Sequence, residues 1–328
     1  MKYIIEQRRL ANIRPHDKPR IKNEILRLRN PEFIYYYLRD VDLYDEDMKQ
    51  ALIDSRDLEW ILEYLKYMKK NGYEIDEETN EKMKRTLIKI GDLNWIYRYL
   101  KDIDRKDEEM KNALIEIGDA KWIYEYIKMI KEKESRIDEK IKQVLIKTRN
   151  AEYFYLYLKD IDPDDKEMKR ALIKTKNNYW IFGYIKLIKK EDNRIDQEMK
   201  QALIDSKQVK WIYKYIELIK KEDNIIDQEM REILLDVING HWASIYLENI
   251  DPYDEDMQKV LIDVGTDGSI YGYFKYMKKN GYEIDEKIKK EMKQALIDTK
   301  SIVYINAYLR DIDRNDEEMK RALINNKT

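Results

Sequence analysis

The sequence predicts an all-α fold, a right-handed α-solenoid of about ten two-helix repeats. Two observations predict it. A string of the form Trp-Ile-Tyr-x-Tyr-Leu/Ile-Lys recurs at spacings of 27, 31 or 35 residues, and a second string, Met-Lys-x-Ala-Leu-Ile, follows many copies. The spacings differ by multiples of four residues, which is about one helical turn. Repeats therefore differ by whole turns, and each apolar face keeps its direction.

The first string predicts the second helix of each repeat, which we call helix B. Its full copies begin at Trp60, Trp95, Trp122, Trp180 and Trp211, and degenerate copies begin at Phe33, Tyr153, Trp242, Ser269 and Tyr304. When the first residue of the string is position 0, positions 0, +1, +4, +5 and +8 fall on one side of a helix and form a broad apolar stripe. We expect this stripe, including the tryptophans, in the core.

The second string predicts the first helix of each repeat, helix A. An Asp stands three residues before the Met and predicts the N-cap, because its carboxylate accepts bonds from the free amides of the first turn. These are Asp45, Asp107, Asp165, Asp196, Asp227, Asp254 and Asp316. In the 35-residue spacings the Asp lies seven residues before the Met, at Asp76 and Asp285, which predicts one more turn in helix A.

The turn from helix A to helix B is predicted by Gly91-Asp92 and Gly118-Asp119. Glycine adopts the left-handed conformation after the end of a helix, and Asp caps the helix that follows. Asp57, Asn150 and Asn177 take the capping position in other repeats.

Neither helix can bury its stripe alone, so neighbouring repeats must cover it in an elongated stack. This is similar to the HEAT, armadillo and tetratricopeptide class in architecture only, because the tetratricopeptide pattern, the ankyrin Thr-Pro-Leu-His and the pentatricopeptide spacing are missing. We expect residues 1–30 to form a basic N-terminal cap with the first helix A, since they hold nine Lys/Arg and three Asp/Glu. Residues 31–328 are predicted as one continuous array that ends in an unpaired helix A.

Composition argues against several classes of function. The chain has no cysteine, which removes disulfides, thiolate metal sites and cysteine nucleophiles. The two histidines, His16 and His241, lie far apart, and no zinc spacing, Walker A, dinucleotide or Gly-x-Ser-x-Gly motif occurs. We therefore expect no catalytic residues, metal or cofactor. No apolar run is long enough for a membrane span, and the N-terminal apolar patch is too short and too charged for a signal peptide, so we expect a cytoplasmic protein.

Asp-rich connections begin at Asp40, Asp102, Asp160 and Asp311. Alternate carboxylates suit a hard cation such as calcium, but the Gly at position 6 and the Glu at position 12 of an EF-hand loop are both missing. Helix capping is the favoured interpretation of these acids.

The other side of helix B carries a second pattern. Seven of the ten residues at position +2 are aromatic, and eight of the ten at position +6 are basic. These positions lie one turn apart and predict a ladder of aromatic and cationic side chains. The candidate partner-binding residues are Tyr35, Arg39, Tyr97, Lys101, Tyr124, Lys128, Tyr155, Lys159, Phe182, Lys186, Tyr213, Tyr271 and Lys275. The alternative interpretation is packing between adjacent B helices, with lysine stems covering the rings.

The predicted function is a non-enzymatic binding scaffold or inhibitor that holds a macromolecule along a Tyr/Lys-lined concave face. A protein is the favoured partner. The alternative is single-stranded RNA or DNA, which aromatic rings and cations would also bind. The net charge of −2 and the use of Lys rather than Arg argue against nucleic acid, and the basic first 30 residues argue for it. The uncovered C-terminal helix A is a candidate contact for a second copy of the chain.

The pattern changes near Glu217, His241, Ser244 and Glu248. A distinct subsite and a degenerate repeat both account for this change.

Overall fold

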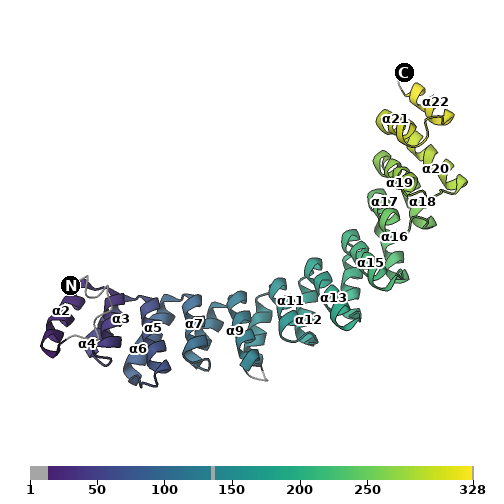
Figure 1. Cartoon of the computed structure of the whole chain (residues 1–328). Helices are drawn as coiled ribbons and strands as arrows, with labels where there is room; N and C mark the ends of the chain where they lie inside the picture. The colour runs from purple at the N-terminus through teal and green to yellow at the C-terminus, as the bar shows by residue number, and fades with distance from the viewer. Residues whose placement is uncertain (1–13, 134–136, 327–328) are drawn as a thin grey trace. The chain divides into compact units, whose positions relative to one another are not determined.

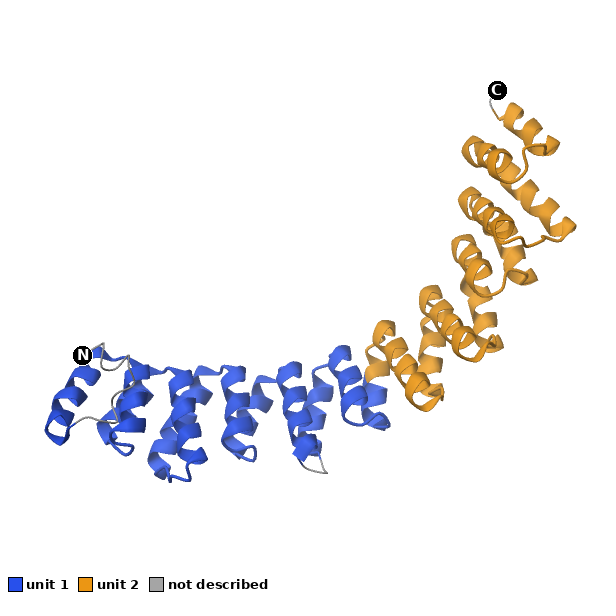
Figure 2. Ribbon diagram, in the orientation of Figure 1, with its two compact units in different colours: residues 1–171 blue, residues 172–328 orange. Residues whose placement is uncertain are grey.

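The computed structural model describes residues 14–133 and 137–326. Over these residues it contains 21 α-helices and no strand, which confirms the all-α repeat fold. The chain divides into two compact units, residues 1–171 and 172–328, and the division falls within helix α12 (Figure 2). Residues 1–13 of the predicted N-terminal cap lie outside the described residues, and its helix A is α2. The predicted grouping of residues 31–328 as one domain stays a prediction.

Unit 1 alternates A and B helices after a short 3-10 helix at Pro15–Asp17. Its A helices are α2 (Lys18–Leu28), α4 (Glu46–Ser55), α6 (Glu77–Ile90), α8 (Glu108–Ile117) and α10 (Glu139–Lys147). Its B helices are α3 (Pro31–Asp40), α5 (Leu58–Lys70), α7 (Leu93–Asp102), α9 (Ala120–Lys133) and α11 (Ala151–Asp160).

The A helix α12 (Lys166–Lys174) precedes the B helices of unit 2, and unit 2 then alternates in the same way. Its B helices are α13 (Asn178–Asp192), α15 (Val209–Asp223), α17 (Gly240–Asn249), α19 (Asp267–Lys279) and α21 (Ile302–Asp311). Its A helices are α14 (Gln197–Ser206), α16 (Gln228–Val237), α18 (Glu255–Val264), α20 (Glu286–Asp298) and α22 (Glu317–Asn325).

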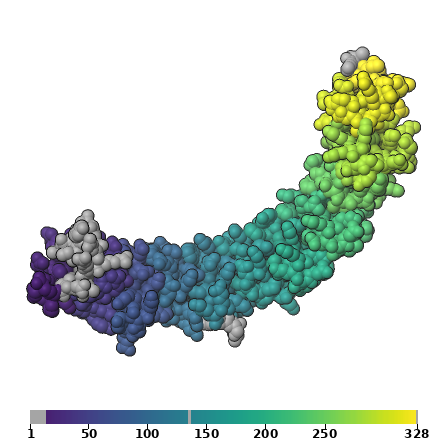
Figure 3. Space-filling view, viewed as in Figure 1, coloured from purple at the N-terminus to yellow at the C-terminus, as the bar shows by residue number. Residues whose placement is uncertain are grey.

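Within each unit the helices form two rows (Figure 1). Successive B helices contact one another, as α3 contacts α5 and α17 contacts α19, and successive A helices do the same, as α4 contacts α6 and α18 contacts α20. We call these the B row and the A row. On the face drawn in Figure 3, side chains fill the gaps between the ribbons of neighbouring helices within each unit.

The repeats differ in length near the B-to-A connection, where helix B ends and helix A begins. Short B helices such as α3 and α7 have 10 residues, whereas α9 has 14 and α13 and α15 have 15. In the 35-residue spacings the A helix is also longer, with 14 residues in α6 and 13 in α20. The additional turn of helix A predicted at Asp76 and Asp285 is therefore confirmed.

The centre of the core is formed by tyrosine rather than tryptophan. Position +4 of helix B is tyrosine in every copy, and each of these side chains is at most 3% exposed. All six tryptophans are half-buried, so the expectation of core tryptophans was wrong. The reason is geometric: position +4 lies about 40° from position 0 and nearer the middle of the apolar stripe, whereas the tryptophan lies at its edge.

The predicted caps of helix A are confirmed. Each Asp three residues before a Met accepts a hydrogen bond from the amide of that Met, and Asp76 accepts one from the Thr79 amide. Asp92 caps α7 in the same way, after Gly91 in the left-handed conformation with φ of +71°. The prediction for Asn177 was wrong in one respect: it stands at the N-cap of α13, but its side chain makes no capping bond.

A basic residue that follows the Met or Ile of helix A links most A helices to the next one. Lys49 is 2% exposed, and its ammonium lies 2.7 Å from the Asp76 carboxylate and 2.6 Å from that of Glu46. Equivalent ion pairs of 2.6–3.3 Å join Lys22 to Asp45, Lys84 to Asp107, Lys111 to Asp138, Lys142 to Asp165, Lys200 to Asp227, Arg231 to Asp254 and Lys293 to Asp316. The sequence reasoning missed these links. A Lys-to-Asp separation of 23 or 27 residues recurs as their signal.

Candidate functional site

The aromatic residues at position +2 lie in the seams between successive B helices. The ring of Tyr35 packs on that of Trp60 in the next B helix, with 5.2 Å between ring centroids. The same contact, at 5.3–5.8 Å, joins Tyr97 to Trp122, Tyr124 to Tyr153, Phe182 to Trp211, Tyr213 to Trp242 and Tyr271 to Tyr304. Position +2 lies about 160° from position 0, so one helix offers its tyrosine to the next helix and its tryptophan to the previous one.

These rings differ in how far solvent reaches them. Tyr35, Tyr124 and Tyr213 are buried, with exposures of 7%, 3% and 2%. The remaining four predicted rings are half-buried: Tyr97, Tyr155, Phe182 and Tyr271. The ladder therefore has a packed part and an accessible part, and ring packing of this kind contributes about 0.5–1.5 kcal/mol for each pair.

Two of the predicted cations are held by acids. The guanidinium of Arg39 makes two bonds to the Asp40 carboxylate, of 2.6 and 2.7 Å, and lies over the rings of Tyr35 and Tyr36. The Lys128 ammonium lies 3.5 Å from Asp160 in the next B helix.

The same carboxylate of Asp160 also accepts the hydroxyl proton of Tyr124, at 2.5 Å. Burial, and then this bond, raise the pKa of the Tyr124 hydroxyl. In unit 2 the Tyr271 hydroxyl donates to Asp311 in the same way, and this bond raises the pKa of Tyr271. The hydrogen bonds from Arg310, and then the bond from Tyr271, lower the pKa of Asp311. These bonds join adjacent B helices and have a structural role.

The other four cations of the ladder are exposed: Lys101, Lys159, Lys186 and Lys275. Among the described residues no carboxylate forms an ion pair of 4.0 Å or less with any of them. Two of these ammonium groups lie over the ring one turn back, Lys101 at 5.9 Å from the Tyr97 centroid and Lys275 at 5.8 Å from that of Tyr271. The structure thus brings together a cation and a half-buried ring at α7 and at α19.

Half-buried tryptophans add to this surface, and the sequence reasoning missed them. Cations cover three of them: Arg98 over Trp95 at 4.4 Å, Lys121 over Trp122 at 5.0 Å, and Lys210 over Trp211 at 4.9 Å. The signal in the sequence is a basic residue at position −1 or +3, both of which face away from the apolar stripe.

The Asp-rich connections serve as turns and caps. In the first of them Asp42 accepts a bond from the Tyr44 amide, and Asp45 caps α4. No group of three or more metal-ligating side chains is found within the described residues. None of the helices described there is long and apolar enough to cross a membrane.

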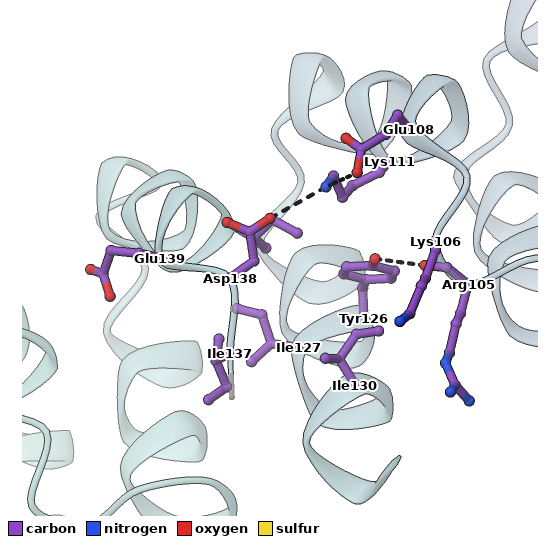
Figure 4. Close-up of a pocket in the computed structure, with 11 residues that line it drawn as sticks. Arg105, Lys106, Glu108, Lys111, Tyr126, Ile127, Ile130, Ile137, Asp138 and Glu139 are labelled. Atoms are coloured by element: carbon purple, nitrogen blue, oxygen red, sulfur yellow. Dashed lines mark hydrogen bonds and ion pairs between the residues drawn. The ribbon is translucent and has the colours of Figure 1, made fainter. Parts of the chain in front are cut away.

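A pocket of about 580 Å³ lies where the short α7–α8 connection meets the longer helix α9 (Figure 4). Its walls include Ile127 and Ile130, and Arg105 and Lys106 extend along the side near Ile130. Its charged groups balance: Lys111 binds Glu108 at 2.6 Å and Asp138 at 3.3 Å. The pocket therefore shows no preference between an anionic and a cationic ligand. The exposed lysines of the B row form the better candidate site.

Comparison with protein-family models, with curated proteins and with solved structures finds no match to this chain.

Proposed function

We propose that this protein is a non-enzymatic binding scaffold or inhibitor that holds an extended acidic segment of another protein along the B row. One observation carries the proposal. The lysine that follows the Met of an A helix, as at Lys49 and Lys200, is buried and paired with acids, whereas Lys101, Lys159, Lys186 and Lys275 of the B row are exposed and have no ion pair in the described part of the chain. Of the lysines at these two repeating positions, only those of the B row are therefore available to a partner.

The spacing of the row suits an extended chain. Packed helices lie about 8–10 Å apart, and three residues of an extended strand rise about 10 Å. Within one unit, every third residue of an extended segment would meet the next B helix. Carboxylates of that segment would pair with the lysines, and its apolar side chains would contact the half-buried rings.

Ring geometry favours protein over single-stranded nucleic acid. Base stacking needs an open aromatic face. The rings at position +2 are within 5.2–5.8 Å of a ring in the next B helix, so the neighbouring helix already occupies much of that space. We also expect the protein to act in the cytoplasm, because a chain without cysteine needs no oxidising compartment.

The test compares two triple variants by fluorescence anisotropy. The probe is a fluorescein-labelled copolymer of glutamate and tyrosine, and the substitutions in the B row are Lys101→Gln, Lys186→Gln and Lys275→Gln. We expect weaker binding by about five-fold, from about 0.3 kcal/mol for each exposed charge. Binding by the unaltered chain should weaken as salt is raised.

The control removes three exposed lysines of A helices, by Lys89→Gln, Lys147→Gln and Lys290→Gln, and should leave binding unchanged. Equal losses in the two triple variants would contradict the proposal. Labelled oligouridine and oligothymidine are titrated in parallel. If they bind more tightly than the copolymer and lose affinity only in the B-row variant, nucleic acid replaces protein as the partner.

A further inference from the structure

Glu248 is an acid at a position where most B helices carry a cation. It lies in the last turn of α17, at position +6, and is half-buried. Its carboxylate is close to Gly272 of α19, since a Cβ atom on that glycine would lie 3.6 Å from Glu248 Oε1. No side chain or amide of the described residues donates a hydrogen bond to this carboxylate, and no cation forms an ion pair with it. Burial raises the pKa of Glu248, and His241 lowers it by a smaller amount.

Glu217 provides a direct comparison, because it occupies the same position on the preceding B helix, α15. Its carboxylate accepts a bond of 2.6 Å from the Lys214 ammonium and one of 3.2 Å from the Tyr213 hydroxyl. The charge of Glu217 is therefore compensated within its own helix. The charge of Glu248 has no such compensation, although both residues break the basic pattern of position +6 in the same way.

A half-buried carboxylate without a donor is unfavourable, because folding removes part of its hydration and returns no hydrogen bond. A cation bound to this carboxylate would offset the free energy lost through its partial desolvation. The space for such a group comes from Gly272, which faces Glu248 without a side chain. Gly272 stands at position +3 of its helix, and several other B helices have a long charged side chain at that position, such as Glu63 in α5, Arg98 in α7 and Lys214 in α15. Tyr276, one turn beyond Gly272, lies near enough for Glu248 to raise the pKa of its hydroxyl, after burial and Tyr282.

We propose that Glu248 and the space over Gly272 form a subsite for a cationic side chain of the bound protein, arginine in preference to lysine. A guanidinium is more weakly hydrated than an ammonium and can make two parallel bonds to one carboxylate, which suits a half-buried site. The proposal rests on the proposed function, in which the B row is the contact surface. It adds that the partner carries a basic residue at this point among acidic ones.

The test uses small cations in place of the unidentified partner. The full chain is labelled with ¹³C at the carboxyl groups of glutamate, and the Glu248 signal is assigned by its absence in Glu248→Gln. N-acetyl-arginine amide is titrated, then N-acetyl-lysine amide, with the neutral N-acetyl-glutamine amide for comparison. We expect the Glu248 signal to shift and saturate with the arginine compound, to need higher concentrations of the lysine compound, and to stay in place with the neutral one.

The matched control is Glu217→Gln, which should leave the Glu248 titration unchanged. The Glu248→Gln chain should fold, because burial opposes the charged form of Glu248 that this substitution removes, and the ligand's own NMR signals should show that it no longer binds arginine amide. A Glu248 signal that fails to saturate with either cation overturns the proposal, and so does unchanged binding by Glu248→Gln. The titration does not depend on the exposed lysines, so failure of the acidic copolymer to bind would count against the proposed function alone.

Discussion

At the scale of single residues, one hydroxyl group distinguishes otherwise equivalent core positions. Tyr64 and Tyr246 both stand at position +4 and are both fully buried. The Tyr64 hydroxyl donates a bond of 3.1 Å to the Leu43 carbonyl, which belongs to the preceding B-to-A connection. The Tyr246 hydroxyl has no hydrogen-bond partner among the described residues. The tyrosine hydroxyl therefore stabilises the repeat that contains Tyr64 and destabilises the repeat that contains Tyr246.

We predict that Tyr64→Phe lowers the free energy of unfolding by about 1 kcal/mol, because it leaves the half-buried Leu43 carbonyl without its donor. Tyr246→Phe removes a hydroxyl that is already unsatisfied and should be neutral or stabilising. Urea unfolding followed by circular dichroism measures both. Equal destabilisation by the two substitutions would show that ring packing alone sets their contribution.

The sequence predicted which side of helix B is buried, but it did not predict which residue lies deepest. Tryptophan is the largest apolar residue in the motif and so appeared to be the core. Its place at the edge of the stripe leaves it half-buried in a seam. The invariance of tyrosine at position +4 was the better signal, because a polar hydroxyl kept at every buried site indicates a fixed packing position.

At the scale of helices, most turns from helix A to helix B need one residue in the left-handed conformation, and only those after α16 and α18 are extended instead among the described residues. Gly91 and Gly118 meet this need without strain. In other repeats a long basic residue does so: Arg29, Arg56, Arg149, Lys176, Lys207 and Lys300 all have φ between +51° and +56°. The glycine turns were predictable, and the basic ones were not, because arginine and lysine carry no intrinsic preference for this conformation. Their charge is favourable near the carboxyl end of helix A.

One substitution should have opposite effects in two places. Gly91→Ala forces a Cβ atom into the left-handed conformation and should cost about 1 kcal/mol. Gly272→Ala lies inside α19, where the new Cβ would make an ordinary contact at 3.6 Å with Glu248, and should stabilise by about 1 kcal/mol through helix propensity. Thermal melting of the two variants measures the sign. A loss of stability in both would mean that close packing at Gly272 outweighs propensity.

At the scale of the whole molecule, the A row makes stability depend on pH. The Asp76 carboxyl is partly buried, which acts to raise its pKa, but hydrogen bonds from Lys49 and Thr79 outweigh burial and lower it to about 2. A carboxyl whose pKa is lower in the folded chain binds fewer protons there than when unfolded. It therefore adds stability above the unfolded value of about 3.9, and this stability is lost as the pH falls through about 2.

We predict that Lys49→Met destabilises the chain at pH 7 by about 1 kcal/mol, a value kept small because the Asp76 side chain is 48% exposed. The difference from the unaltered chain should shrink as the pH is lowered through about 2, where Asp76 of the unaltered chain becomes protonated. Urea unfolding across this range measures it. Lys70→Met, at an exposed lysine of α5, is the control and should have no effect. A difference that is constant with pH would assign the effect to packing.

The repeat itself could be predicted from the sequence because whole-turn spacing and Asp caps act locally. The candidate site could be predicted only in part. Periodicity places Lys101 and Lys128 at the same position, but it cannot show that Lys128 meets Asp160 in the next B helix while Lys101 meets no acid in the described residues. Glu248 stood out only as a change of pattern, because its lack of compensation depends on Gly272 in another helix.

The N-cap Asp of an A helix has two roles, because it caps the first turn of its own helix and also binds the basic residue of the preceding A helix. Asp227 bonds the first turn of α16 through the Met230 amide and also binds Lys200 of α14. If α16 unravels at its start, α14 loses its anchor in the same event, and loosening passes from one A helix to the one before it. At α18 this chain of dependence stops. There α18 carries Gln258 in place of the lysine, and the Gln258 amide donates hydrogen bonds to the Tyr273 hydroxyl and the Pro252 carbonyl. Neither partner belongs to α20, so opening of α20 leaves these two bonds intact.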